Sequence, residues 1–212
     1  AWWARAGEGG RSVARGGGVL RWQLKNYRDD VSPMVDLVPS GLPEGEPRPF
    51  SLQVDDAADT ARLNNALYRV TGDSNGTIDV TETSDPLVFE FQDENGLSAR
   101  KEFRFDPQNF TLTATITAHR GSTPLNPAIH WGPGLGDQGA ASGGGSIFTG
   151  NAVSPPRVLF HRAGDVERLL SEDVAETPVQ QGPFRFVGVD DHYFVSFVVS
   201  DDEMVAAPDI TM

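Results

Sequence analysis

Histidines and clustered acids are the residues of this sequence that are best suited to chemistry. Its histidines are scattered and do not share the helical spacing typical of metal ligands: they are His119, His130, His161 and His192. Asp190-Asp191-His192 is a dense group of ligand types, but neighbours on a strand point to opposite faces. These three side chains would converge on one ion only at a turn. The pattern favours a turn leading into a strand, and we expect no metal site.

Paired acids are the second candidate for catalysis. They are adjacent in polar stretches, at Asp29-Asp30, Asp55-Asp56 and Asp201-Asp202. General acid/base pairs normally come from different elements, with burial raising one pKa. We therefore interpret these acids as solvated surface.

Nucleophilic catalysis has no support in the sequence. No Gly-x-Ser-x-Gly elbow is present, and Gly143-Gly144-Gly145-Ser146 lies in a linker-like stretch. The absence of cysteine excludes a thiol nucleophile, thiolate zinc sites and disulfides. We expect no catalytic residue and no cofactor.

The stretch AIHWGPGLGD, residues 128–137, has the glycine content of a ligand-binding loop. A dinucleotide loop needs Gly-x-Gly-x-x-Gly between a strand and a helix. Here a Gly/Ser-rich segment follows, at 138–146, and Pro133 removes a backbone donor that an anion would need. We predict the end of a strand turning into a loop, with Ile129 and Trp131 packed inward.

Composition narrows the classes of partner. The 212 residues carry a formal charge of −13, which repels nucleic acid, and 38% are hydrophobic, which predicts a folded core. No apolar run is long enough to span a bilayer, and the opening residues do not form a signal peptide. Because residue 1 is not methionine, we expect an excised fragment or a processed chain.

Alternation with a period of two predicts antiparallel strands as the main elements. FTLTATITA, residues 110–118, places threonines on one face and apolar residues on the other. Asn95-Gly96 predicts a hairpin turn. The expected meander runs through strands 87–91, 99–105 and 110–118, with a second turn at Asp106-Pro107.

Other segments are predicted from similar patterns. Residues 19–24 alternate as a half-buried strand, and HYFVSFVVS, residues 192–200, predicts a strand buried on both faces. Residues 55–70 favour a short helix or a loop, and 164–174 favour helical turns or an edge strand. Residues 39–49 are a proline- and glycine-rich surface loop. The sequence therefore predicts an all-β, largely antiparallel sandwich.

Four motifs in order resemble one family. They are GGGVLRWQLKNYRDD, VDLVP, FTLTATITAHRGSTPLNPAIHWGPGLGD and FRFVGVDDHYFVSFVV, within residues 16–199. This set is similar to the extracytoplasmic, periplasmic domain of the bacterial YidC membrane-protein insertase. The resemblance implies a β-supersandwich, like that of galactose mutarotases, over residues 16–212. Residues 1–15 match poorly, and the C-terminus is a candidate truncation.

The resemblance also implies a function. The family inserts and folds inner-membrane proteins, and this domain is an accessory that contacts Sec translocon components and nascent membrane proteins. It implies no catalytic, cofactor or metal residue. The expected location is the periplasmic face of the bacterial inner membrane, within a multi-pass protein whose transmembrane part lies outside this domain.

A carbohydrate-active or carbohydrate-binding mutarotase-like domain is the alternative. It requires a histidine acid and a glutamate base on one concave surface. His119 continues the threonine face of its strand and His192 opens a strand that is predicted to be buried, and neither has an evident acid partner. We expect Trp22 and Trp131 to belong to the core rather than to a sugar platform. A free-standing periplasmic chaperone or adhesion module would show the same sequence.

Overall fold

The computed structural model divides the chain into two compact units, residues 1–137 and 138–212. The structure describes residues 2–4, 13–24, 35–38, 46–71, 85–106, 108–109, 111–131, 135, 157–190, 194–199 and 210–211.

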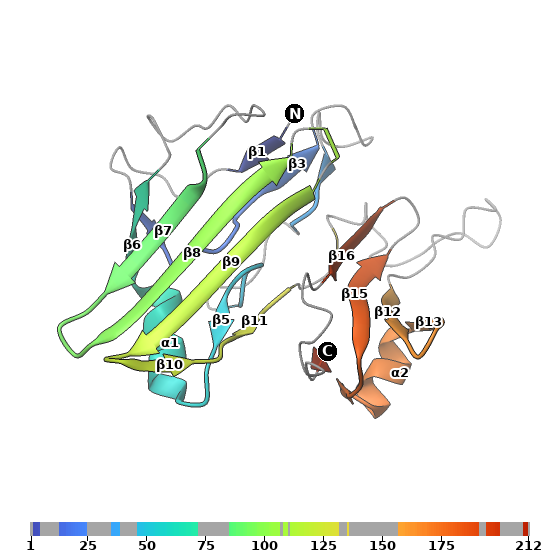
Figure 1. The fold of residues 1–212 in the computed structure, drawn as a ribbon. Helices are drawn as coiled ribbons and strands as arrows, with labels where there is room; N and C mark the ends of the chain where they lie inside the picture. The colour runs from blue at the N-terminus through green and yellow to red at the C-terminus, as the bar shows by residue number, and fades with distance from the viewer. Residues whose placement is uncertain are drawn as a thin grey trace. The chain divides into compact units, whose positions relative to one another are not determined.

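A six-stranded antiparallel sheet organises the first unit (Figure 1). Its spatial order is β10-β9-β8-β7-β6-β2, with bounds β2 Val13–Arg15, β6 Leu67–Thr71, β7 Leu87–Gln92, β8 Leu97–Asp106, β9 Thr111–Arg120 and β10 Thr123–Leu125. Every residue of β8 pairs with β9, from Leu97 opposite Arg120 to Asp106 opposite Thr111. The predicted meander and its Asn95-Gly96 turn are confirmed, and Gly96 has a positive φ of 81°. Phe110 and Pro107 lie outside the described residues.

The two faces of this sheet differ as the alternation predicts. The threonines of β9 are exposed, at positions 111, 113, 115 and 117, whereas Ala118 is buried and Leu112 is half-buried. Inward side chains of β7 and β8 include Leu87, Phe89 and Phe103. One face therefore belongs to the core and the other to solvent.

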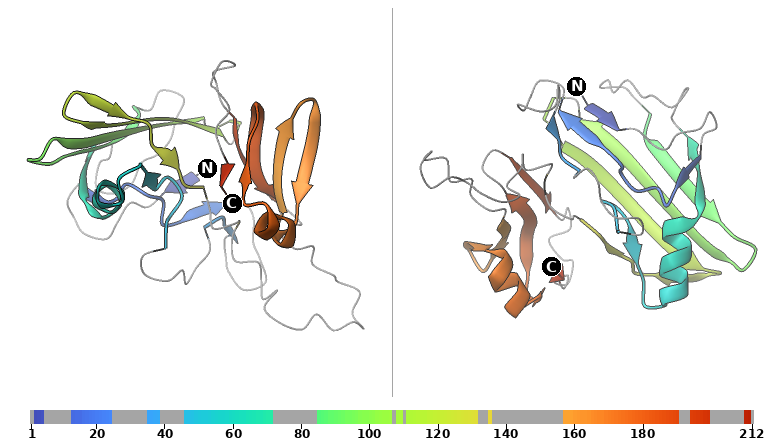
Figure 2. Two further views of the ribbon diagram at one scale, coloured as in Figure 1. Left: turned by 90° about the horizontal axis from the view of Figure 1, so that it is seen from below. Right: turned by 180° about the vertical axis from the view of Figure 1, so that it is seen from behind.

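Helix α1 (Ala57–Asn65) and short strands cover the core face of the sheet, as Figures 1 and 2 show. The strands are β1 Trp2–Ala4, β3 Trp22–Leu24, β4 Val35–Asp36, β5 Leu52–Gln53 and β11 Ala128–Ile129. They form two small antiparallel sheets, β1-β3-β4 and β11-β5. The predicted strand over 19–24 is confirmed only for its second half, β3.

Helix α1 is fixed by side-chain hydrogen bonds at both ends. The Asp56 carboxylate caps the start by accepting from the Asp59 backbone N–H at 2.8 Å. Near the end, the Asn64 amide pairs with the backbone of Leu52, accepting its N–H at 2.9 Å and donating to its carbonyl at 2.7 Å. These two hydrogen bonds attach the helix to β5. The prediction of a short helix in this segment is confirmed.

The core of the first unit is aromatic. Phe50 contacts Phe103 and Trp131 edge to face, with ring centroids 4.9 and 5.2 Å apart. Trp22 packs 6.5 Å from Trp131, and both tryptophans lie against the buried cluster. The core assignment of these tryptophans is confirmed. The prediction that Ile129 packs inward is wrong, because Ile129 is 46% exposed. Strand β11 ends at this residue, so the alternation of inward and outward side chains does not continue.

The second unit contains a four-stranded antiparallel sheet of order β13-β12-β15-β16 (Figure 1). Its strands are β12 Arg157–Arg162, β13 Asp165–Leu169, β15 Phe184–Asp190 and β16 Val195–Val199. Helix α2 (Ser171–Glu176) follows β13, so segment 164–174 supplies both a strand and a helix. Strands β14 Val179–Gln180 and β17 Ile210–Thr211 form a separate pair.

Strand β16 corrects one sequence-based prediction. It was expected to be buried on both faces, but Val195, Phe197, Val198 and Val199 are each about half exposed. The reason is position: among the described strands β16 pairs only with β15 and lies at the edge of its sheet. An apolar run indicates a hydrophobic strand, but it does not indicate whether that strand lies at the centre or at the edge of its sheet.

Several predicted features lie outside the described residues. These are the loop at 39–45, the acid pairs 29–30 and 201–202, the glycine-rich segments 132–134 and 136–146, and Asp191-His192. Within the predicted surface loop 39–49, residues 46–48 are exposed or half-buried, whereas Pro49 is buried.

Candidate functional site

A buried lysine stands at the centre of the first unit. On β8, alternation places Lys101 on the same inward face as Ala99 and Phe103, and its side chain is fully buried. Its partners across the sheet are Phe89 and Ile116. A buried ammonium is costly unless polar groups satisfy it. A buried lysine at this position therefore requires hydrogen-bond acceptors close to its Nζ atom.

Three backbone carbonyls accept from the Lys101 ammonium. The Nζ atom donates to Phe50 O at 2.6 Å and to Gly16 O at 2.7 Å, with a longer contact of 3.4 Å to Gly17 O. All three acceptor residues have left-handed backbone angles, with φ of 69°, 66° and 56° respectively. Such an angle is strained for phenylalanine. The local backbone is thus bent so that its carbonyls face the lysine.

Burial changes the acid–base properties around this lysine. It lowers the pKa of Lys101 to about 7, because the charged form loses its hydration. The Tyr68 ring lies 5.4 Å from Nζ, and burial raises the pKa of its phenol. No ion pair of the described residues includes Lys101, and its polar contacts there are three carbonyl oxygens and the face of one aromatic ring.

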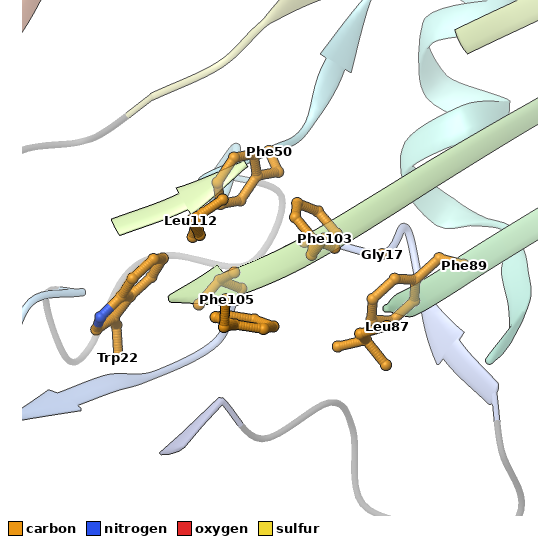
Figure 3. Close-up of a pocket in the computed structure, with 10 residues that line it drawn as sticks. Gly17, Trp22, Phe50, Leu87, Phe89, Phe103, Phe105 and Leu112 are labelled. Carbon is orange, nitrogen blue, oxygen red and sulfur yellow. The ribbon is translucent and has the colours of Figure 1, made fainter. Parts of the chain in front are cut away.

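Two residues whose carbonyls accept from this lysine, Gly17 and Phe50, also line a small apolar hollow (Figure 3). Its volume is about 40 Å³, and it is lined by Gly17, Gly18, Val19, Trp22, Phe50, Leu87, Phe89, Phe103, Phe105 and Leu112. No lining side chain carries a hydroxyl, an amide or a charge. A cavity that binds benzene measures about 150 Å³, so this hollow does not fit a sugar and lacks the groups to orient one.

The outer face of the same sheet carries a chain of ion pairs. Glu90 binds Arg69 at 2.7 Å and Arg100 at 3.0 Å, and Glu102 binds Arg100 at 2.6 Å and Arg104 at 2.7 Å. We call these five residues the arginine–glutamate chain. The threonines of β9 continue this polar surface. In the views of Figures 1 and 2, helix α1 and β5 lie on the opposite side of the sheet.

The residues considered for catalysis do not come together in the described part of the chain. His119 lies on the polar outer face, opposite Ser98 and Pro124. His130 pairs through its backbone with Phe50 and Ser51, and burial lowers the pKa of its imidazole against the opposing charge of Glu46.

The acidic candidates have structural roles where they are described. Asp56 caps α1, and Asp190 pairs with Arg168 at 3.1 Å. No group of three or more metal-ligating side chains is found among the described residues.

Sequence reasoning missed Lys101 as well as its acceptors. A usable signal was present: in LSARKEFRF, the positions two before and two after Lys101 are Ala99 and Phe103, which are both apolar. A cation inside an apolar alternation is a candidate buried charge. The matching carbonyls had no such signal, because they come from residues 51 to 85 positions away.

The architecture is that of an all-β, mainly antiparallel protein with two short helices in the part described, and its apolar hollow lacks catalytic groups. The sequence model of the YidC periplasmic domain family matches residues 12–209, nearly the whole chain. The chain therefore belongs to the YidC periplasmic domain family, as the ordered motifs predicted. Neither the curated proteins nor the solved structures contain a significant match.

Membership of this family identifies a domain of a YidC-type insertase on the extracytoplasmic side of the inner membrane. Within the described residues, neither helix is long and apolar enough to cross a bilayer.

Proposed function

We propose that this domain is a non-catalytic accessory of a YidC-type membrane-protein insertase, acting through protein–protein contacts. The family match supports the insertase part of the proposal. The proposed partners are nascent membrane proteins and Sec translocon components, and the whole protein is proposed to be multi-pass. We also propose that residues 16–212 form one β-supersandwich domain.

The observation that carries this proposal is the outer face of the six-stranded sheet. It combines the arginine–glutamate chain with the exposed threonines of β9, on ten-residue strands paired along their whole length. Exposed guanidinium, carboxylate and hydroxyl groups provide donors and acceptors across one rigid surface. Such a surface suits a polar, reversible protein contact.

Site-specific photocrosslinking in the full-length insertase tests this assignment. A photoreactive amino acid is placed at Thr115, at the middle of β9, and the matched control is at Asn65, which is exposed on α1. Crosslinks to a Sec subunit or to a nascent membrane protein are expected from Thr115 and not from Asn65. Equal crosslinking at both positions, or none from Thr115, would contradict the proposed face.

The non-catalytic part has its own test. An aldose mutarotation assay on the chain is expected to show no rate above the uncatalysed one. Turnover that is abolished by His119→Ala or His192→Ala would instead establish the carbohydrate-active alternative.

A further inference from the structure

The chain uses lysine at very few positions. Of its 17 basic residues, Lys25 and Lys101 are the only lysines, and the rest are arginines. Arginine keeps its charge at every pH that proteins tolerate, whereas a buried lysine is able to lose its proton. The fully buried cation of the six-stranded sheet is therefore one of the two basic side chains that can become neutral.

Two of the three acceptors of Lys101, Gly16 and Gly17, lie on a segment with few backbone bonds, whereas the third, Phe50, is packed in the core and bonded to the backbone of His130. Gly16 and Gly17 form a turn after β2, a three-residue edge strand that pairs only with β6 among the described strands. Backbone bonds of this segment to its surroundings are Gly16 N–H to Ala66 O at 2.8 Å and Val19 N–H to Pro49 O at 3.0 Å. Lys101 itself lies on β8, which is paired on both sides. Local opening therefore releases the turn rather than the lysine.

The two short bonds of Lys101 need only two N–H groups, which a neutral amine also has. The third N–H of an ammonium has only the longer contact to Gly17 O. Burial thus leaves the extra proton poorly compensated. We propose that Lys101 is a proton-dependent latch: the Gly16–Gly17 turn stays closed over β8 when the amine is neutral and is released when the amine is protonated.

The charged groups on the surrounding elements do not compensate this proton. On β6, β7 and β8 they are the arginine–glutamate chain of the outer face and Asp106 at the end of β8, whose carboxylate accepts from Gln108 and Asn109. On α1, Asp59 pairs with Arg120 and Arg62 with Asp93. The remaining ones are Arg15, which is exposed beside the turn, and Glu46 and Arg48 in the loop before Phe50. Tyr68 is the titratable group whose ring faces Nζ, and burial keeps its phenol protonated by raising its pKa.

The direction of the effect follows from proton linkage. In the closed form burial lowers the pKa of Lys101 to about 7, whereas a solvated lysine has a pKa near 10.5. The open form therefore binds more protons throughout that range. Opening becomes less favourable as the pH rises, by at most about tenfold per pH unit for one proton.

Release of the turn has a defined structural consequence. Gly17, Gly18 and Val19 line the apolar hollow together with Leu87 and Phe89, and a Cβ added at Gly17 would lie 3.5 Å from the Phe89 Cβ. Opening the turn exposes these buried side chains to solvent. The latch thus controls whether the apolar interior of the first unit is covered.

A single introduced thiol measures the opening, because the chain has no cysteine. Val19→Cys is made in the 212-residue chain, alone and together with Lys101→Met, and thiol labelling is followed from pH 7 to pH 9.5. The ratio of the two labelling rates cancels the titration of the thiol itself. We expect the ratio of lysine to methionine protein to fall by up to about tenfold per pH unit. A constant or rising ratio would overturn the latch.

Two further measurements keep the test decisive. Arg100→Met removes a cation from the outer face of the same strand and should leave the pH slope unchanged. If Lys101→Met does not fold, NMR of ¹³Cε-labelled lysine replaces it, since the spectrum contains two lysine signals and Lys25→Arg assigns them. A Lys101 midpoint well below that of the urea-unfolded chain supports the latch only if labelling of Val19→Cys, divided by the rate in the urea-unfolded chain, also falls as the pH rises; an equal midpoint or a constant labelling ratio overturns it.

Discussion

Strand β8 carries cations on both of its faces, and their environments are opposite. On the outer face, Arg100 and Arg104 bind Glu102 with their side chains exposed to water. On the inner face, Lys101 is fully buried and binds only uncharged carbonyls. The outer ion pairs stay hydrated and contribute little to the free energy of folding. The inner lysine has lost its hydration, so only protein groups can accept its hydrogen bonds. Adjacent positions on one strand therefore have very different energetic importance.

The largest loss of stability is expected when a carboxylate replaces the buried amine of Lys101. Lys101→Glu places a carboxylate against three carbonyl oxygens, which cannot donate to it, so the free energy of unfolding should fall by about 3–5 kcal/mol. Urea denaturation measures this loss. The matched variant is Arg100→Glu on the outer face, for which a loss of about 1 kcal/mol or less is expected. Similar losses for both variants would remove the distinction between the two faces.

The second effect concerns the turn that faces the lysine. An added Cβ at Gly16 would lie 2.4 Å from the Asn64 carbonyl oxygen, and φ there is 66°. Gly16→Ala should therefore cost about 2 kcal/mol or more, from the clash and the left-handed angle together. Gly121 has a similar φ of 60° with open space around it, and its alanine variant should cost about 1 kcal/mol. Thermal unfolding of both variants separates the clash from the angle, and equal costs would exclude a clash.

The third effect tests how α1 is attached to the unit. Asn64→Ala removes two hydrogen bonds to Leu52 and should lower the free energy of unfolding by about 1–2 kcal/mol. The neighbouring Asn65 is exposed and donates to the Ala61 carbonyl of its own helix. Its alanine variant should change stability by no more than about 0.5 kcal/mol. A larger loss at Asn65 than at Asn64 would contradict the proposed attachment.

The smallest loss of stability is expected from a substitution on the outer face, at Glu102. Hydrogen bonds from Arg100 and Arg104 lower the pKa of Glu102, so its contribution is present above the pKa of an unfolded glutamate and is lost as the pH falls through its folded value. Glu102→Gln should cost less than Asn64→Ala, and high salt should reduce the difference further. Urea denaturation at pH 7 and pH 3, at low and high salt, checks this. A loss that salt and acid leave unchanged would show a role other than ion pairing.

The sequence predicted the features that depend on local pattern. The β7–β9 meander followed from alternation and from Asn95-Gly96, and the structure adds that the Asp93 carboxylate accepts the N–H groups of Asn95 and Leu97 at the turn. Strand β16 could not be placed, because burial of an apolar run depends on which strands lie beside it. The role of Asn64 has no local signal, because its partner Leu52 lies twelve residues away.

The candidate site was harder to predict than the fold. Alternation alone locates Lys101 on the inner face, but its acceptors arrive from two distant segments with left-handed backbone angles. A phenylalanine with positive φ, such as Phe50, has no sequence signature. The residue pattern therefore indicates a buried lysine, but the carbonyls that bind it depend on backbone geometry far away in the sequence.

The scarcity of lysine has a consequence for proteolysis. A protease that cuts only after lysine has two sites in this chain, Lys25 and Lys101. The second site is a buried residue inside a ten-residue strand with partners on both sides, so cleavage there requires β8 to leave the sheet. The fragment that ends at Lys101 thus reports unfolding of the first unit by itself. The chain contains its own gel-based stability probe without any label.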